Sequence, residues 1–194
     1  MADPDGKRPW RVLNTAYPVA DRWLRLRTDL VQTAGGRRLS LPPVIEHPDW
    51  VDVVALTPDD TVVLVSQYRH AVGEVRIEFP AGTVEAGEPP LSAIRRELLE
   101  ETGYASDDWH LLGSAPVCPA VQDNRIFSYL ALGARRVADQ TLDAGEAIRA
   151  FEMPLDQFLA GVEAGGIELP ALQLAGLWWL RARLGGRSGR GPSP

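Results

Sequence analysis

The chain has 194 residues, 45% of them hydrophobic and 24% charged, and a formal net charge of −6. This composition is that of a globular protein with room for one domain and an appendage. The negative charge argues against nonspecific binding to nucleic acid or to anionic membranes. The single cysteine, Cys118, excludes an intrachain disulfide. A polar start without an apolar signal segment then leads us to expect a cytoplasmic location.

The first part of the chain is predicted to form a tail and a small β-subdomain. Residues 1–9 are polar and are expected to be flexible, whereas residues 10–47 contain strand-forming segments with a hairpin turn at residues 34–37. A few strands joined by turns bury little apolar surface alone. We therefore expect this subdomain to pack on the main domain or on a second copy of the chain.

Residues 48–184 are predicted to form the main domain. Apolar β-branched runs predict strands at residues 50–56 and 61–68, and further strands are expected within 76–80, 109–117, 125–137 and 147–154. Helices are expected near residues 89–102, 155–161 and 169–184. This mixture predicts an α/β (α+β) fold, an α/β/α sandwich around a mixed sheet, followed by a disordered tail over residues 185–194.

Residues 82–104 (GTVEAGEPPLSAIRRELLEETGY) are predicted to be a loop that leads into a short helix. Pro89 and Pro90 suit a first helical turn, and Gly103 suits the position just past the helix end. The remaining feature of this helix is its acidic face, formed by Glu97, Glu100 and Glu101.

These glutamates fall within a sector of about 100° beside the apolar stripe of the helix. Like charges at this spacing destabilise a helix by about 0.2–0.5 kcal/mol per pair, and acids in the last turn oppose the helix dipole. From the residues alone, two interpretations stay open: a solvated acidic face paired with Arg95 and Arg96, or oxygen ligands for a cation such as Mg²⁺.

The full spacing resembles the box of the Nudix hydrolases at each fixed position, namely Gly82, Glu88, Arg96, Glu97, Leu98, Glu100, Glu101 and Gly103. Tyr104 departs from the usual aliphatic residue, which concerns packing and not chemistry. The resemblance implies that Glu97, Glu100 and Glu101 are catalytic and hold Mg²⁺, or Mn²⁺ as a substitute. Gly82, Glu88, Arg96 and Gly103 would then be supporting residues.

The segment before the box, SQYRHAVGEVRIEFPAG, resembles ADP-ribose pyrophosphatases and related nucleoside-diphosphate-sugar hydrolases. The resemblance implies that Arg69 contacts a substrate phosphate and that the Ala81 carbonyl is a metal ligand, roles that suit a guanidinium and a hard oxygen donor. For Arg69 the alternative is an ion pair with Glu74 or Glu78.

The segment after the box resembles the same group only in part. Pro119, 15 residues beyond Tyr104, matches a proline that would shape the wall beside the terminal ribose. Asn124 stands where this group has a glutamate that acts as a base or metal ligand, so Glu146, ahead of Asp123, is our candidate for the general base.

Aromatic residues before and within the main domain are candidates for stacking on the substrate base. Trp50 is the one we assign to substrate binding, and Trp10 and Trp23 are further candidates. For each of these residues, packing in the core or at a dimer interface is the alternative.

The resemblance implies hydrolysis of the pyrophosphate bond in a nucleoside diphosphate derivative, with ADP-ribose first, giving AMP and ribose 5-phosphate. Another nucleotide sugar such as GDP-mannose is the alternative. A nucleotide-binding sensor domain without catalysis is disfavoured, because every box carboxylate is present. An enzyme that removes oxidised triphosphates is a weaker option. The resemblance further implies a homodimer through the N-terminal strands.

Overall fold

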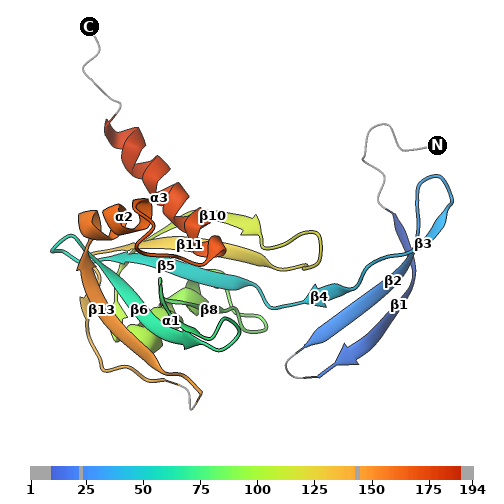
Figure 1. The fold of residues 1–194 in the computed structure, drawn as a ribbon, viewed down its shortest axis with the longest axis horizontal. Coiled ribbons are helices and arrows are strands. Elements are labelled where there is room, and N and C mark those ends of the chain that lie inside the picture. Colours follow the sequence, from blue (N-terminus) through green and yellow to red (C-terminus); the bar gives the residue numbers. More distant parts are fainter. Residues whose placement is uncertain (1–9, 22–23, 143–144, 189–194) are drawn as a thin grey trace, which may run out of the picture. The chain divides into compact units, whose positions relative to one another are not determined.

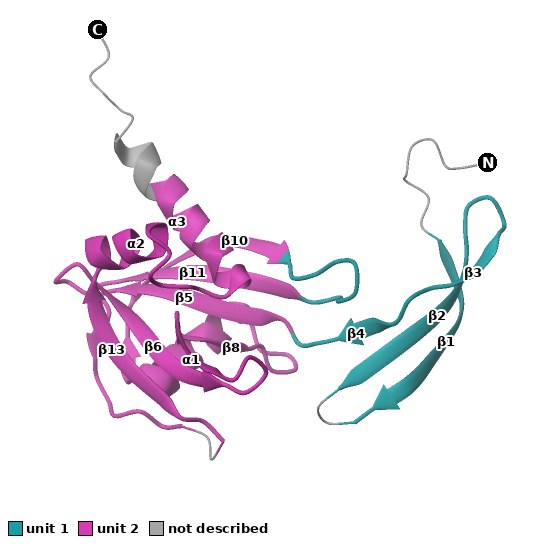
Figure 2. Ribbon diagram, viewed as in Figure 1, with its two compact units in different colours: residues 1–48, 116–124 teal, residues 49–115, 125–194 magenta. Residues whose placement is uncertain are grey.

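The structure, a computed structural model, describes residues 10–21, 24–142 and 145–188. It consists of two compact units, residues 1–48 with 116–124, and residues 49–115 with 125–194 (Figure 2). The sequence-based division near residue 48 assigned residues 116–124 to the main domain, whereas the structure groups them with the N-terminal strands. The predicted tail at residues 1–9, the last residues of the predicted C-terminal tail and Trp23 lie outside the described residues.

The first unit is a small antiparallel sheet of β1 (Arg11–Ala20), β2 (Arg25–Gln32), β3 (Arg38–Ser40) and β4 (Val44–Glu46). β2 is central, and it pairs with each of the other strands. Residues 116–124 join this unit through backbone contacts with β4, because the Ile45 N–H donates to the Val121 carbonyl at 2.8 Å.

The second unit contains a mixed sheet in the order β10 (Asp108–Pro116), β11 (Arg125–Leu132), β5 (Trp50–Leu56), β6 (Thr61–Arg69) and β13 (Ile148–Pro154). β11 and β5 are parallel, whereas β5 pairs with β6 and β6 with β13 in antiparallel fashion. Two short strands extend it, β7 (Glu74–Glu78) beside β6 and β8 (Ala81–Thr83) beside β5. β9 (Tyr104–Ala105) and β12 (Arg135–Arg136) form a separate pair.

Three helices cover the two faces of this sheet: α1 (Pro90–Thr102), α2 (Leu155–Glu163) and α3 (Ala171–Ser188) (Figure 1). Side chains alternate between the faces of a strand, so Val51 and Val53 pack with α1 whereas Val54 and Leu56 pack with α2 and α3. This arrangement confirms the predicted α/β/α sandwich. α3 continues beyond the predicted end at residue 184 to Ser188, so the first residues of the predicted disordered tail are helical.

The box helix α1 begins and ends as its sequence predicts. Pro90 occupies the first turn, and Gly103 adopts the left-handed conformation (φ 76°), with its N–H donating to the Leu99 carbonyl at 2.8 Å. A Cβ atom at Gly103 would lie 2.1 Å from the Ala138 carbonyl oxygen, so glycine is also required for close packing. The predicted loop, which begins at Gly82, is wrong at residues 82 and 83, because they belong to β8 (Ala81–Thr83).

Candidate active site

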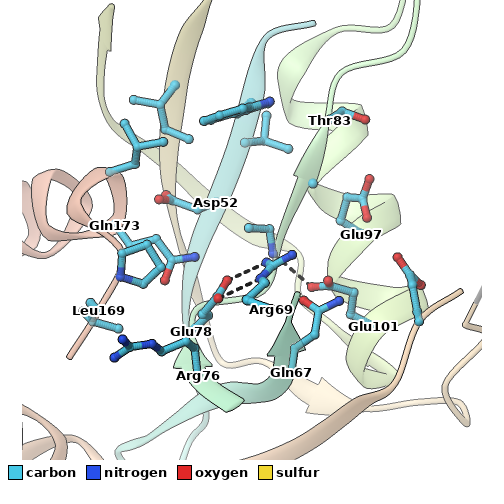
Figure 3. A pocket seen from close by; sticks show the side chains of 18 of the residues that line it. Asp52, Gln67, Arg69, Arg76, Glu78, Thr83, Glu97, Glu101, Leu169 and Gln173 are labelled. Carbon is cyan, nitrogen blue, oxygen red and sulfur yellow. Dashed lines mark hydrogen bonds and ion pairs between the residues drawn. The ribbon is translucent and has the colours of Figure 1, made fainter. Parts of the chain in front are cut away.

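A cavity of about 900 Å³ opens in the second unit, between β5, β6, β7, β8, α1 and the start of α3 (Figure 3). Its volume is within the range of small-molecule sites. The structure brings together in its lining the predicted residues Trp50, Arg69, Ala81, Gly82, Arg96, Glu97, Glu100, Glu101 and Glu146. Glu88, Gly103 and Pro119 are not among its lining residues.

The cavity lies where the two central strands of the sheet diverge. β5 pairs with β6 only at Ala55 and Leu56, opposite Val63 and Val62. Beyond that point β8 takes the place beside β5, and β7 takes the place beside β6. Residues of all four strands therefore line the cavity, among them Asp52, Gln67, Glu78 and Ala81.

Ala81 in β8 presents its backbone to the carboxylates of α1. It lies opposite Asp52 in a pair without direct hydrogen bonds, since the Val53 N–H donates to the Pro80 carbonyl at 3.1 Å. Both polar groups of Ala81 therefore point away from β5. Its N–H donates to Glu101 Oε2 at 3.0 Å, so its carbonyl faces the same side as that carboxylate. This geometry supports the predicted role of the carbonyl as a metal ligand.

Gly82 lets the Glu97 carboxylate lie directly against β8. A Cβ atom at this position would be 2.0 Å from Glu97 Cδ and 2.1 Å from its Oε1. Any other residue would push the carboxylate away from the Ala81 backbone. The first glycine of the box thus has a packing role in placing Glu97.

Arg96 binds the other acidic side chains of the box. Its Nη1 donates to Glu97 Oε1 at 2.8 Å and to Glu100 Oε2 at 3.2 Å, and its Nη2 donates to Glu88 Oε2 at 3.1 Å. The bond from Arg96 to Glu88 is the main cause that lowers the pKa of Glu88. The alternative of an ion-paired acidic face is therefore realised through Arg96, whereas the Arg95 guanidinium lies over the Trp109 ring, 5.6 Å from its centroid.

Burial and mutual repulsion make Glu97 and Glu101 hard to ionise. Burial is the main cause that raises the pKa of Glu101 to about 8, with contributions from Glu97 and Glu146, and the Ala81 N–H and Arg69 oppose it. The pKa of Glu97 is raised by burial first and by the Glu100 and Glu146 carboxylates, against the effect of Arg96. Crowded buried carboxylates of this kind are stabilised by a cation.

The oxygen donors fit a hard divalent cation, which prefers carboxylates and backbone carbonyls. Glu97 and Glu101 project from one side of α1 toward the cavity (Figure 3). Within the described ranges, no three acidic, histidine or cysteine side chains already surround one metal position. A cation bound here would compete with Arg96 for the Glu97 and Glu100 carboxylates.

Arg69 makes the ion pair that the sequence left as an alternative. Its Nε donates to Glu78 Oε1 at 2.8 Å and its Nη2 donates to Glu78 Oε2 at 2.6 Å. Glu78 is buried, so this two-bond pair fixes the guanidinium beside Glu101 in the cavity wall (Figure 3). The two bonds to Glu78 use only part of the Arg69 guanidinium, which has five N–H donors in all. A phosphate role for Arg69 stays a prediction.

The segment that resembles the ADP-ribose group only in part belongs to the first unit. Asn124 is 2% exposed, and its Nδ2 donates to the Pro48 carbonyl at 2.9 Å. Asp123 Oδ1 accepts the His47 N–H at 3.3 Å. Both residues support the internal structure of that unit, and neither lines the cavity. Glu146 does line it, which favours Glu146 over Asp123 as the general base.

Sequence reasoning missed several polar residues of the cavity: Asp52, Gln67, Arg76 and Gln173. Gln173 of α3 exchanges two hydrogen bonds with the Phe79 backbone, at 2.8 and 3.0 Å, and so fixes the start of α3 to the β7–β8 connection. Burial raises the pKa of Asp52 to about 7, and the adjacent Ser128 hydroxyl opposes that shift. The available signal was an isolated polar residue within an apolar run, as in WVDVVAL.

The NUDIX domain family model matches residues 46–171 of this chain. A Methanol dehydrogenase activator of Bacillus methanolicus is 33% identical over 150 residues, which cover 77% of this chain and 80% of that protein. An ADP-ribose pyrophosphatase of Mycobacterium tuberculosis is 38% identical over 113 residues, covering 58% of this chain and 54% of that protein. A solved structure described as an ADP compounds hydrolase shares the fold, with a TM-score of 0.79 and 21% identity over 95% of this chain and 98% of the other.

The fold, the carboxylate-lined cavity and these similarities define a pyrophosphohydrolase that works with divalent metal ions. The chain belongs to the Nudix family. Across the described residues, none of the helices combines the length and apolar character needed to cross a membrane.

Proposed function

We propose that the protein hydrolyses the pyrophosphate bond of ADP-ribose in the presence of Mg²⁺, giving AMP and ribose 5-phosphate. The observation that carries this proposal is the meeting of the Ala81 backbone, Glu97 and Glu101 in one cavity with Arg69. The name of the M. tuberculosis relative, an ADP-ribose pyrophosphatase, supports the choice of substrate.

Glu97, Glu100, Glu101 and the Ala81 carbonyl would hold the Mg²⁺. When bound, the ion supplies positive charge at the diphosphate and makes water easier to deprotonate. Arg69, fixed by Glu78, would orient a phosphate oxygen by donating hydrogen bonds from its guanidinium. These two sources of positive charge matter because the chain as a whole carries −6 and repels an anionic substrate.

Glu146 would act as the general base. Its carboxylate lines the cavity close enough to raise the pKa of both Glu97 and Glu101. It accepts a proton from the attacking water as the new P–O bond forms, and the bond from that phosphorus to the bridging oxygen breaks. The bridging oxygen leaves with the other phosphate, so each product is a monophosphate.

The substrate is tested by incubating the protein with Mg²⁺ and ADP-ribose, GDP-mannose or a nucleoside triphosphate, and identifying the products by mass spectrometry. We expect ADP-ribose to have the highest kcat/KM. A preference for GDP-mannose would replace the sugar and base in this proposal but keep the reaction. Binding of ADP-ribose without hydrolysis of any compound would instead favour the sensor interpretation.

A second candidate is the activation of a dehydrogenase, favoured by the 33% identity with the Methanol dehydrogenase activator over 77% of this chain. Adding the protein to a purified methanol dehydrogenase tests this function. A rise in dehydrogenase rate with the unaltered protein would support it, and an unchanged rate would refute it.

A further inference from the structure

One face of the sheet carries a row of polar residues between two apolar rows. Residues two apart in a strand share a face, and β5 and β11 are parallel and in register. The rows across these strands, from the cavity inward, are Trp50 with Ile126, Asp52 with Ser128, and Val54 with Leu130. Val54 and Leu130 belong to the core below α2 and α3, whereas Trp50 and Ile126 line the cavity.

The polar row is buried, and no residue outside it forms a hydrogen bond with it in the described part of the chain. Asp52 and Ser128 are both 0% exposed. Among the described residues, neither carboxylate oxygen of Asp52 nor the Ser128 hydroxyl has a partner in full hydrogen-bonding geometry, although the hydroxyl lies near enough to the carboxylate to lower its pKa. A buried polar group left unpaired costs stability, and a carboxylate costs more than a hydroxyl. The row therefore needs an explanation outside the packing of the apolar core.

Two residues of the helix that covers this row, Gly176 and Gln173, offer it no hydrogen-bond donor. Gly176 of α3 lies against it, and a Cβ atom there would be 3.0 Å from Ser128 Oγ and 3.4 Å from Asp52 Oδ1. Gln173, one turn earlier on α3, directs its amide to the Phe79 backbone. The fold thus brings α3 close to the polar row without supplying a donor from either residue.

Asp52 also forms part of the cavity wall, although its carboxylate exposes no surface there (Figure 3). The cavity residues around it include the apolar side chains of Ile126, Leu169 and Leu172. Asp52 also lies directly across from Ala81, whose carbonyl faces the box carboxylates. The part of a substrate next to a diphosphate held at Ala81 would therefore reach this region.

We propose that Asp52, with Ser128 beside it, is a specificity-determining residue that accepts a hydrogen bond from the organic part of the substrate. The donor is an O–H of the sugar or an N–H of the base, and both offer the same chemistry to a carboxylate. An ionised phosphate has only acceptor oxygens and so offers no donor to this carboxylate. This inference rests on the proposed function and names the residue that selects its substrate.

The first test compares Asp52→Asn and Asp52→Leu with the unaltered protein. Hydrogen bonds to charged groups contribute about 1.5–3 kcal/mol, which corresponds to about 10–150-fold. We expect KM for ADP-ribose to rise by about that factor, with kcat changed by only a few-fold. The thermal midpoint should stay equal or rise, because an unpaired buried carboxylate is removed. A residue with only a structural role would lower the midpoint and leave KM unchanged, which would overturn the proposal.

Asp29→Asn is the matched control, because Asp29 is a largely buried carboxylate of the first unit that is already paired with Arg27 at 3.0 Å. It should lower stability without changing KM. Binding of AMP and of ribose 5-phosphate, measured by calorimetry, then locates the donor. The product that Asp52→Asn binds more weakly than the unaltered protein carries the hydrogen-bond donor. Equal affinity of Asp52→Asn and the unaltered protein for both products would contradict the assignment.

These binding measurements also separate this inference from the proposed function. If the unaltered protein binds ADP-ribose but hydrolyses none of the compounds, the proposed function is wrong. Asp52 still stands as a recognition residue if Asp52→Asn binds ADP-ribose about 10-fold or more weakly than the unaltered protein. Equal binding by the two proteins refutes it.

Discussion

At the scale of single residues, the chemistry of this site depends on Glu101, a buried carboxylate that forms no ion pair with Arg96. The side chain is 5% exposed and accepts a hydrogen bond from the Ala81 N–H, while Arg96 pairs with Glu97 and Glu100. Glu101 is therefore the box carboxylate with the most to gain from a cation. Without a cation it holds its proton to a higher pH than an exposed glutamate does.

This state gives a pH-dependent prediction for Glu101→Gln. The folded pKa of Glu101 is about 8 and the ordinary value is 4.5, so between these values the folded chain holds a proton that the unfolded chain has lost. Stability of the metal-free protein then falls as pH rises through this window. Glu101→Gln should remove that loss. At pH 8.5 its free energy of unfolding should exceed that of the unaltered protein by at least about 1 kcal/mol, which raises the thermal midpoint by about 2–4 °C. At pH 4.5 the two proteins should differ little.

Thermal unfolding with a chelator at both pH values measures this effect. With saturating Mg²⁺, the same variant should keep its fold and lose at least about 100-fold in kcat/KM, because a ligand of the catalytic cation is missing. Near-normal activity would remove Glu101 from the metal site.

Glu146 gives a second prediction at this scale. Glu146→Gln should lower kcat by about 10²–10⁴-fold, the usual contribution of a general base, with little change in KM. Asp123→Asn is the control, because Asp123 pairs with His47 in the first unit and should leave kcat unchanged. If the control loses activity and Glu146→Gln stays within a few-fold of the unaltered protein, the base has been assigned to the wrong segment.

At the scale of secondary structure, the short strand β8 determines where the box carboxylates lie. Gly82 allows Glu97 to lie across this strand, and the pairing of β8 with β5 turns the Ala81 backbone toward α1. The positions of β8 and α1 are therefore coupled, so that a change in β8 displaces the carboxylates of α1.

Gly82→Ala tests this coupling. The added Cβ atom would meet the end of a flexible side chain, Glu97 Cδ, at 2.0 Å, so the fold should persist while the carboxylate moves. We expect the apparent Mg²⁺ affinity to fall by about 10–100-fold, as for other displaced metal ligands, measured from the Mg²⁺ dependence of activity. Gly166→Ala is the control, since its Cβ atom would lie 3.6 Å from the nearest backbone oxygen. Equal Mg²⁺ affinity in both variants would contradict this role of Gly82.

The elements differ in how far their sequences predict them. Residues 50–56 and the helix from Pro90 carry local signals, namely a β-branched apolar run and well-placed proline and glycine residues, and both form as expected. β8 was missed because a three-residue strand that contains glycine has no pattern, and only its pairing with β5 makes it a strand. Residues 116–124 were assigned to the main domain because their contact with Ile45 is distant in sequence.

The same distinction applies to the site. The box carboxylates could be found because their spacing is local to one helix. Asp52 stands out in the sequence only as one polar residue within an apolar run, and this does not place it in a cavity because β5 is buried on both faces and shows no periodicity. The Arg69–Glu78 pair also depends on the β6–β7 register, which the sequence does not specify.

At the scale of the whole molecule, the first unit exposes large apolar side chains. Trp10 is 50% exposed, Val12 54% and Tyr17 44%, and all belong to or adjoin β1. Exposed apolar groups gathered on one strand are typical of an interaction surface. We predict a homodimer in solution through these N-terminal strands.

Sedimentation at micromolar concentration measures this state directly, and twice the chain mass of 21.2 kDa is expected. Val12→Lys should shift the equilibrium toward monomer, because it places a charge on the proposed interface, whereas Val137→Lys, at an exposed position of the second unit (64%), should not. A monomer for the unaltered chain at every concentration would contradict the prediction.

The most direct test of the account is hydrolysis of ADP-ribose in ¹⁸O-labelled water with Mg²⁺, followed by mass spectrometry of the products. We predict equal amounts of AMP and ribose 5-phosphate, one ¹⁸O atom incorporated per cleavage event, and loss of turnover when the metal is chelated. Release of inorganic phosphate or pyrophosphate, or turnover that persists in the chelator, would contradict the assignment of Ala81 and the box glutamates to metal-dependent cleavage of a pyrophosphate bond.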